Sequence, residues 1–403
     1  MNKSLIFFVL CGYLLSNGYI GSVKIYEQRG LDRSAEYVEI EIPNCLTKLT
    51  NNILAINKTN LDTILCQVTK KVNISNGYLH KTIIFPVDIS AYDSLSFDIN
   101  VSESNDRTSG TPYNIKLTGE KTEIIVENDF YIADLRANEK DEEKSFHSGQ
   151  ITDLTIKLGF NKLLTNRDDR IHWAPNFKRP EIEYYKTIAH WNNPKEQWNN
   201  TGEYLIRTWR KDGAPSHPEI MLSAEYSFFA GKPYFLFNSN MEIINDVMLE
   251  WLRNDEMTMD TMFTNLAFKR KTGEIIDIPI AERGEILEKS PIAVDDPWLC
   301  FYNKDIGYGF GSIRLDYDIS NMEGNASPTG VNYTSIAEWE NRTTYWNRRI
   351  IYNELTDVAK GSKYIEKNAY IVFDINQGEH LEAINKWSEL LMYPLIVKTT
   401  YKY

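Results

Sequence analysis

Polar and apolar residues alternate with a period of two along most of this chain, from Glu36 to Asp374. The segment Glu36–Ile42 reads Glu-Tyr-Val-Glu-Ile-Glu-Ile, and Ile151–Leu158 alternates in the same way. Successive side chains of a β-strand point to opposite faces of the sheet, so this period predicts strands with one buried face. Turn-forming residues separate the segments, as at 303–307. The pattern therefore restricts the chain to a mainly β fold.

Further strand-like segments follow at short intervals: 82–85, 95–99, 228–237, 263–270, 275–280, 298–302, 309–317, 345–352 and 369–374. A helix is expected over 380–392, where apolar residues form one stripe and Pro394 follows, and a short helix is expected over Ile244–Arg253. No repeat of fixed period is present, which disfavours a propeller or a solenoid. We predict a large antiparallel two-sheet super-sandwich with a short C-terminal helix.

The N-terminus has the form of a secretory signal. Lys3 precedes an apolar run from Leu5 to Leu15, and small residues follow it. A membrane-spanning helix needs roughly 20 apolar residues, so this run is too short to serve as one. We predict a signal peptide over 1–21, a single domain over 22–403, no transmembrane segment, and a secreted or periplasmic protein.

Net charge and cysteine content argue against two classes of protein, nucleic-acid-binding proteins and disulfide-stabilised scaffolds. The net charge is −12, which disfavours a nucleic-acid partner, and an acidic ligand would then need a local basic pocket. Beyond the signal the chain keeps Cys45, Cys66 and Cys300. Three thiols cannot all pair, so this is no disulfide scaffold, although a Cys45–Cys66 bridge stays open.

Familiar catalytic motifs are absent. The chain has no phosphate-binding P-loop, no glycine-rich dinucleotide fingerprint, no His-Glu-x-x-His and no Gly-x-Ser-x-Gly. No cysteine–histidine set has the spacing of a structural zinc site. Nucleotide enzymes, classical metalloproteases and serine hydrolases are therefore disfavoured. No cofactor is expected, although a divalent metal bound by His172 and His190 stays an alternative.

The least regular part of the chain, 166–216, carries the densest group of chemically active side chains. Four of the nine tryptophans lie between 173 and 209. Long irregular segments on a β scaffold are usually functional. Aromatic rings stack on sugar rings, while Asn, Arg and His bind hydroxyls and carboxylates, so a carbohydrate ligand is indicated. The residues predicted to contact it are Arg170, His172, Trp173, Tyr184, Tyr185, His190, Trp191 and Arg207, joined by Arg253 and Asn254 from the later cluster 250–256.

Several short segments resemble the galactose-mutarotase-like β super-sandwich proteins of saccharide breakdown. These segments are Asp32-Arg33 with Glu36–Ile40, Cys66–Val68, Ile84–Asp88, Phe229–Phe235, Trp298–Leu315, and the closing helix before Pro394-Leu395. Phe229–Phe235 is similar to the sheet of heparinase-type and hyaluronate-type polysaccharide lyases. The helical toroid of many such lyases is missing here. The Asn-, Ile- and Lys-rich composition also resembles marine Bacteroidetes proteins of ulvan-degrading clusters, which include lyases and an oligosaccharide dehydratase.

The resemblance implies β-elimination on a uronic-acid-containing poly- or oligosaccharide. Elimination needs a donor that neutralises the carboxylate, a base that removes the C5 proton and an acid that protonates the leaving oxygen. We expect His172 or His190 as the base and Tyr184 or Tyr185 as the acid. We expect Arg253 with Asn254 to neutralise the carboxylate, because a guanidinium bonds a carboxylate through two hydrogen bonds.

Two other functions fit the same residues. A glycoside hydrolase would use carboxylates such as Glu225 or Glu256, and a non-catalytic glycan-binding protein would use the aromatic side chains alone. Trp173 and Trp191 also suit a hydrophobic core. Arg253 also suits a surface ion pair with Asp255 or Glu256, which would themselves suit a turn. The sequence carries no signal for oligomeric state.

Overall fold

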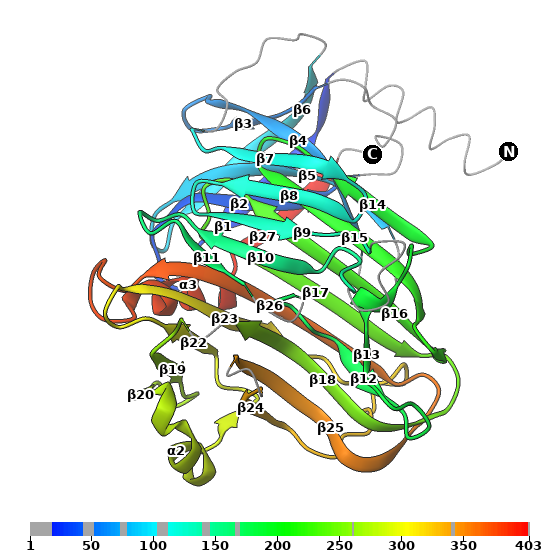
Figure 1. Ribbon diagram of the computed structural model, residues 1–403. Helices are drawn as coiled ribbons and strands as arrows, with labels where there is room; N and C mark the ends of the chain where they lie inside the picture. Colours follow the sequence, from blue (N-terminus) through cyan, green and yellow to red (C-terminus); the bar gives the residue numbers. More distant parts are fainter. Residues whose placement is uncertain are drawn as a thin grey trace, which may run out of the picture. The chain divides into compact units, whose positions relative to one another are not determined.

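The computed structural model describes residues 18–42, 52–72, 79–102, 112–138, 146–165, 170–259, 262–339 and 343–401. Strands dominate it, and the helices are short (Figure 1). This confirms the mainly β, antiparallel fold with a helix near the C-terminus, α3 (Glu382–Met392). Most of the predicted signal peptide, 1–21, lies outside the described residues, as does Cys45. No helix among the described residues is long and apolar enough to cross a membrane.

Contacts divide the chain into two compact units. The first comprises described residues of 1–114, 200–205 and 389–403, and the second those of 115–199 and 206–388. The prediction that 22–403 forms a single domain stays a prediction. The first unit holds one seven-stranded sheet, in the order β2 (Arg33–Glu41), β5 (Leu79–Ile89), β4 (Thr63–Val72), β3 (Asn52–Asn57), β6 (Ser94–Ser102), β1 (Tyr19–Tyr26) and β27 (Ile396–Tyr401). Its own core includes Ile25, Phe85 and Phe97.

The second unit holds three sheets. The nine-stranded sheet has the order β14 (Glu196–Asn200), β15 (Leu205–Ala214), β16 (His217–Phe229), β17 (Tyr234–Ile243), β26 (Lys363–Asp374), β23 (Tyr308–Asp316), β22 (Trp298–Tyr302), β19 (Asn265–Lys269) and β20 (Ile275–Pro279). The six-stranded sheet has the order β13 (Lys186–Thr187), β12 (Asn176–Lys178), β18 (Val247–Met259), β25 (Thr344–Val358), β24 (Tyr333–Glu338) and β21 (Ile292–Ala293). The five-stranded sheet has the order β11 (Lys162–Leu164), β10 (Ile151–Ile156), β9 (Tyr131–Leu135), β8 (Glu123–Asn128) and β7 (Ile115–Glu120). Short helices complete this unit: η2 (Ile188–His190), η3 (Ile280–Glu282) and α2 (Arg283–Lys289).

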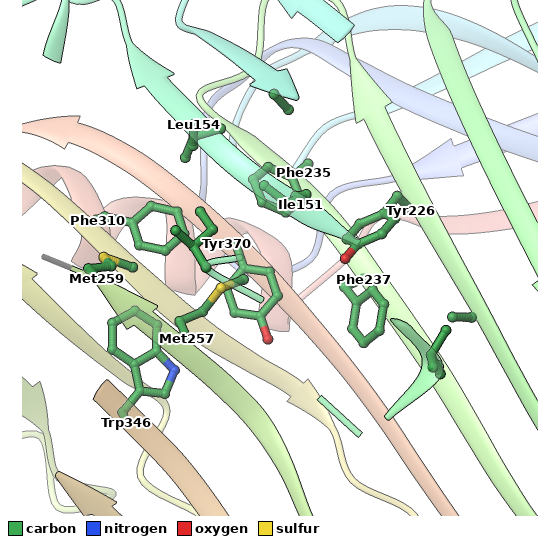
Figure 2. Close-up of a cluster of buried hydrophobic side chains, with 14 of the residues drawn as sticks. Ile151, Leu154, Tyr226, Phe235, Phe237, Met257, Met259, Phe310, Trp346 and Tyr370 are labelled. Carbon is green, nitrogen blue, oxygen red and sulfur yellow. The ribbon is translucent and has the colours of Figure 1, made fainter. Parts of the chain in front are cut away.

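One hydrophobic core joins these three sheets, as in a sandwich (Figure 2). The nine-stranded sheet contributes Phe237 and Tyr370, the six-stranded sheet contributes Met257 and Trp346, and the five-stranded sheet contributes Leu154. These side chains are almost completely buried. Removing apolar surface from water is the main driving force for folding, so this core fixes which face of the six-stranded sheet is left for other contacts.

The helix predicted over Ile244–Arg253 is wrong, because most of this segment belongs to strand β18. Val247 and Leu249 are buried and alternate with more exposed neighbours, as in any half-buried strand. The register with β25 then shifts between Leu249 and Trp251. Such a bulge adds one residue, which places Leu249 and Leu252 three apart and imitates the spacing of a helix.

Candidate functional site

The six-stranded sheet turns one face toward the core and presents polar and aromatic side chains on the other. Cross-strand pairing sets Asn176 opposite Arg253, Arg253 opposite Arg349, and Arg349 opposite Tyr333. Residues paired directly in an antiparallel sheet share a face. These four side chains therefore form a row across strands β12, β18, β25 and β24, on the face away from the core.

The next row on this face is aromatic. Trp251 pairs with Tyr352, and their ring centroids lie 4.9 Å apart. Tyr185, from the irregular segment before β13, stacks parallel to Trp251 at 6.4 Å, and Trp173 meets Tyr185 edge-on at 6.1 Å. All four aromatic residues are only partly buried. Together they offer flat apolar surfaces, which suits stacking against a sugar ring.

Two arginines lie on these rings. The guanidinium carbon of Arg253 is 3.5 Å from the ring centroid of Trp251, and that of Arg349 is 3.9 Å from Tyr352. Such stacking holds the planar guanidinium in place and leaves its edge for hydrogen bonds. Nε of Arg253 and Nδ2 of Asn347 are buried and have no hydrogen-bond partner among the described residues. We call this surface the aromatic–arginine face: Trp173, Asn176, Tyr185, Trp251, Arg253, Glu256, Tyr333, Tyr345, Asn347, Arg349 and Tyr352.

A second bulge in β18 brings Glu256 to this face. In a regular strand, residues three apart point to opposite faces. The register shifts between Asn254 and Met257, and Asp255 has a φ of 46°. Glu256 thereby comes within 3.7 Å of the Arg253 guanidinium and accepts a hydrogen bond of 2.5 Å from Asn176. The bulge therefore places the carboxylate of Glu256 next to the guanidinium of Arg253.

The electrostatics of Glu256 and Tyr185 determine the protonation state of each side chain. Burial raises the pKa of the Glu256 carboxyl, while Arg253, Arg170 and Arg349 act against this rise. Burial and the nearby Glu256 also raise the pKa of Tyr185, to about 12. Glu256 is therefore a stronger base than an ordinary glutamate, and Tyr185 is a neutral phenol that can donate a proton.

Asp255, on the core side of the same bulge, is held by a buried network. Its carboxylate accepts hydrogen bonds from Ser312 at 2.9 Å, Trp346 at 3.1 Å and Tyr317 at 3.0 Å. Its backbone N–H donates to Glu366 at 2.7 Å. A non-glycine residue at positive φ is strained and persists only where its surroundings hold it. The network supplies that support and fixes the bulge.

The structure places His172 in the core. Its side chain is 0% exposed, it shares a hydrogen bond with Tyr226, and its ring meets Phe237 edge-on at 4.3 Å. Burial, with Arg210 and Arg170 nearby, holds its pKa well below the usual range. A glycan cannot reach a fully buried imidazole, so the burial of His172 argues against its predicted role as the base.

His190 and Trp191 belong to the η2 segment. His190 accepts a hydrogen bond of 3.1 Å from the Thr187 backbone and stacks on Phe146 at 4.4 Å, so it helps to cap this short helix. Trp191 is buried and donates to the Gly213 carbonyl at 2.7 Å, as its core alternative implied. Tyr184 is 69% exposed, whereas Tyr185 lies on the aromatic–arginine face.

The predicted arginines separate into two groups. Arg170 stacks on Trp173 at 3.9 Å and acts against the rise in the pKa of Tyr185, so it lies against the aromatic–arginine face without being part of it. Arg207 bonds Ser227 at 3.0 Å and Glu225 at 3.4 Å in the nine-stranded sheet. Asn254 points to the other side of β18, where Arg348 donates to it at 3.4 Å. Arg253 is 5% exposed, so its pairing with Glu256 is not a surface ion pair.

Sequence reasoning did not single out Asn176, Arg349 and Tyr352 as ligand contacts. Their strands are far apart in the chain, and only the register of the six-stranded sheet brings them together. Among the described residues, no three His, Cys, Asp or Glu side chains gather as a metal site requires.

Comparison with known proteins shows the fold. No family model matches the chain, and no curated protein matches it. Among solved structures, it is similar to a protein of glycosyl hydrolase family 38 from Enterococcus faecalis, with a TM-score of 0.51, 11% identity, and coverage of 94% of this chain and 47% of that one. It is also similar to an alpha-mannosidase from Enterococcus faecalis V583, with a TM-score of 0.53 and 10% identity, and the match covers 96% of this chain and 48% of that one. The chain thus spans about half the length of these structures, and its fold is one that occurs in saccharide-degrading enzymes.

Proposed function

We propose that this protein acts on a uronic-acid-containing glycan bound at the aromatic–arginine face. The observation that carries the proposal is the row of stacked rings and guanidiniums centred on Trp251 and Arg253. Rings bind the apolar faces of sugars, and arginine pairs with carboxylates through its planar fork. Nε of Arg253 is buried without a hydrogen-bond partner among the described residues, and a carboxylate bound at the edge of this guanidinium would give it one.

The reaction that these side chains support is β-elimination. Arg253 and Arg349 neutralise the uronate carboxylate and so acidify the C5 proton. Glu256 removes that proton, the C4–O bond breaks as the C4–C5 double bond forms, and the Tyr185 hydroxyl protonates the leaving oxygen. Glu256 takes the place that the sequence suggested for a histidine. A leaving glycosidic oxygen makes the protein a lyase, and a leaving hydroxyl makes it a dehydratase. Ulvan, to which the resemblance points, is one glycan of this class.

A glycoside hydrolase is the second candidate, because the two solved structures described above are named as a glycosyl hydrolase family 38 protein and an alpha-mannosidase. Hydrolysis needs two carboxylates on either side of the scissile bond. The two acids considered from the sequence lie on different sheets: Glu225 pairs with Arg207 in the nine-stranded sheet, whereas Glu256 pairs with Arg253 in the six-stranded sheet. Glu225 is therefore not part of the aromatic–arginine face, and Glu256 alone does not supply the pair of carboxylates that hydrolysis needs.

Incubation of the full chain with a panel of uronate polysaccharides and their oligomers tests the proposal. Elimination produces a conjugated unsaturated uronate, which absorbs in the ultraviolet. Reducing ends without that absorbance would show hydrolysis instead, and binding without either product would show a glycan-binding protein. No binding to any acidic glycan would overturn the proposal. Arg253→Gln serves as the site control and should lose both binding and turnover.

A further inference from the structure

A pocket opens next to the aromatic–arginine face, between helix α2 and strand β24. Its volume is about 700 Å³, which is in the range of ligand-binding pockets. Leu287, Pro291 and Ile336 form apolar parts of its wall, and Ser335 contributes a hydroxyl. A wall of this mixed kind can hold a sugar, which has apolar C–H faces and polar hydroxyls.

Tyr333 belongs to both surfaces. It lines the pocket, and its hydroxyl accepts a hydrogen bond of 3.0 Å from Nη1 of Arg349, which stands next to Arg253 across β18 and β25. Strands in a sheet are about 4.8 Å apart, so the line from Arg253 to Tyr333 spans about 10 Å. A chain of a few sugars laid along the row would therefore reach Tyr333, in the wall of the pocket.

The charges of the pocket differ from those of the row. Nη2 of Arg283 is paired with Glu338 at 2.9 Å, and Nη1 of Arg283 donates to the Ile280 carbonyl at 2.8 Å. Glu288 also lines the pocket, and its charge adds to that of Glu338. The lining thus has two carboxylates and one guanidinium, which disfavours a second anionic sugar and favours an uncharged one.

We propose that the pocket between α2 and β24 is a subsite for an uncharged sugar next to the uronate bound at Arg253. The glycan would then contain acidic and uncharged sugars in the same chain. This inference rests on the proposed function, because the row must hold the uronate for the neighbouring sugar to reach the pocket.

Gly284 offers a clean way to fill the pocket. It lines the pocket, and a Cβ built there meets no heavy atom within 4 Å. Gly284→Phe should therefore fold, since replacing glycine within a helix is favourable. Glu285→Phe is the matched control: it adds the same ring to the same helix at a side chain that is 80% exposed and outside the pocket lining.

The test measures affinity by calorimetry for oligosaccharides of increasing length, built from uronate and uncharged sugars. The unaltered protein should bind longer oligomers about tenfold more tightly than the shortest, which is about 1.4 kcal/mol. Gly284→Phe should abolish this gain and keep the affinity for the shortest oligomer, while Glu285→Phe should preserve both. If Gly284→Phe fails to fold, Leu287→Trp fills the same space.

Three outcomes contradict the inference: an affinity that does not rise with length, a gain that survives Gly284→Phe and Leu287→Trp, or an equal loss in Glu285→Phe. Each leaves binding at the aromatic–arginine face intact. If the unaltered protein binds no uronate oligomer of any length, the proposed function fails, and the subsite fails with it.

Discussion

Arg253 is the side chain on which the choice of an acidic ligand depends most. It lies 3.5 Å above the Trp251 ring and is almost buried, so its guanidinium is held rigidly with Nε unpartnered. A rigid fork loses little entropy when it binds a carboxylate, in contrast to a flexible lysine ammonium. The geometry around Arg253 therefore makes a charge-conserving substitution informative.

Arg253→Lys should weaken the binding of a uronate oligomer by about ten- to hundredfold, because a hydrogen bond to a charged group contributes about 1.5–3 kcal/mol. Calorimetry measures this loss. Arg136→Lys is the control, since the Arg136 side chain is 52% exposed and pairs with Asp134 and Asp153 away from the face. Equal affinities for Arg253→Lys and the unaltered protein would remove the arginine from the ligand site.

Glu256→Gln should slow elimination by about 10²–10⁴-fold while leaving substrate affinity nearly unchanged, because glutamine keeps the shape but cannot accept the proton. The unaltered enzyme should lose rate as the pH falls through the pKa of Glu256, because only the ionised carboxylate is a base. That pKa is raised by burial, so the loss should begin above the range of an ordinary glutamate. A pH–rate profile of kcat that is flat across this range would argue against Glu256 as the base.

The bulge of strand β18 is the element that assembles the face. It places Glu256 beside Arg253, and it points the Asp255 side chain toward the core, where the carboxylate contacts Arg314 and Tyr317. Asp255→Ala should lower the free energy of unfolding by about 3–5 kcal/mol, because it leaves the buried Arg314 without its carboxylate. Denaturant unfolding measures this.

Asp255→Gly is the companion variant. It also loses the carboxylate, but glycine tolerates positive φ, so it should be more stable than Asp255→Ala by about 0.5–1 kcal/mol. The opposite order would show that the bulge is not strained at this position.

Strand β18 also shows how far the sequence can predict this fold. Period-two alternation identified the β class, and the stripe ending before Pro394 identified α3, because both depend on neighbours along the chain. The Val247–Met259 strand was misread where a bulge broke that period. Residue type predicts Tyr185 and Arg253 as ligand contacts, and that stays a prediction, whereas it does not predict Arg349, whose place beside Arg253 depends on strand register.

At the scale of the whole molecule, a buried carboxyl group links stability to pH. Burial and the neighbouring Asp255 raise the pKa of Glu366 to about 8, against 4.5 for the ordinary group. The folded state therefore holds this proton more tightly than the unfolded state, and the stabilisation is complete below about pH 4.5. It is lost as the pH rises toward about 8.

Between about pH 4.5 and about pH 8, the free energy of unfolding should fall by about 1.4 kcal/mol for each pH unit because of Glu366. Glu366→Gln should remove this fall. Urea midpoints of the variant and the unaltered protein, measured in parallel across the window, give the difference. Parallel curves for the two proteins would show that Glu366 does not titrate there.

The two outermost described segments of the chain meet in one sheet, since β27 pairs with β1 from Ile396 opposite Tyr26 to Tyr401 opposite Gly21. During synthesis β1 emerges from the ribosome well before β27. Until then β1 has β6 on one side and an uncovered edge on the other, and such edges recruit foreign strands. A nascent chain in which β27 has not yet been made therefore exposes this edge of β1 to aggregation, and the sheet of the first unit is complete only once β27 is added.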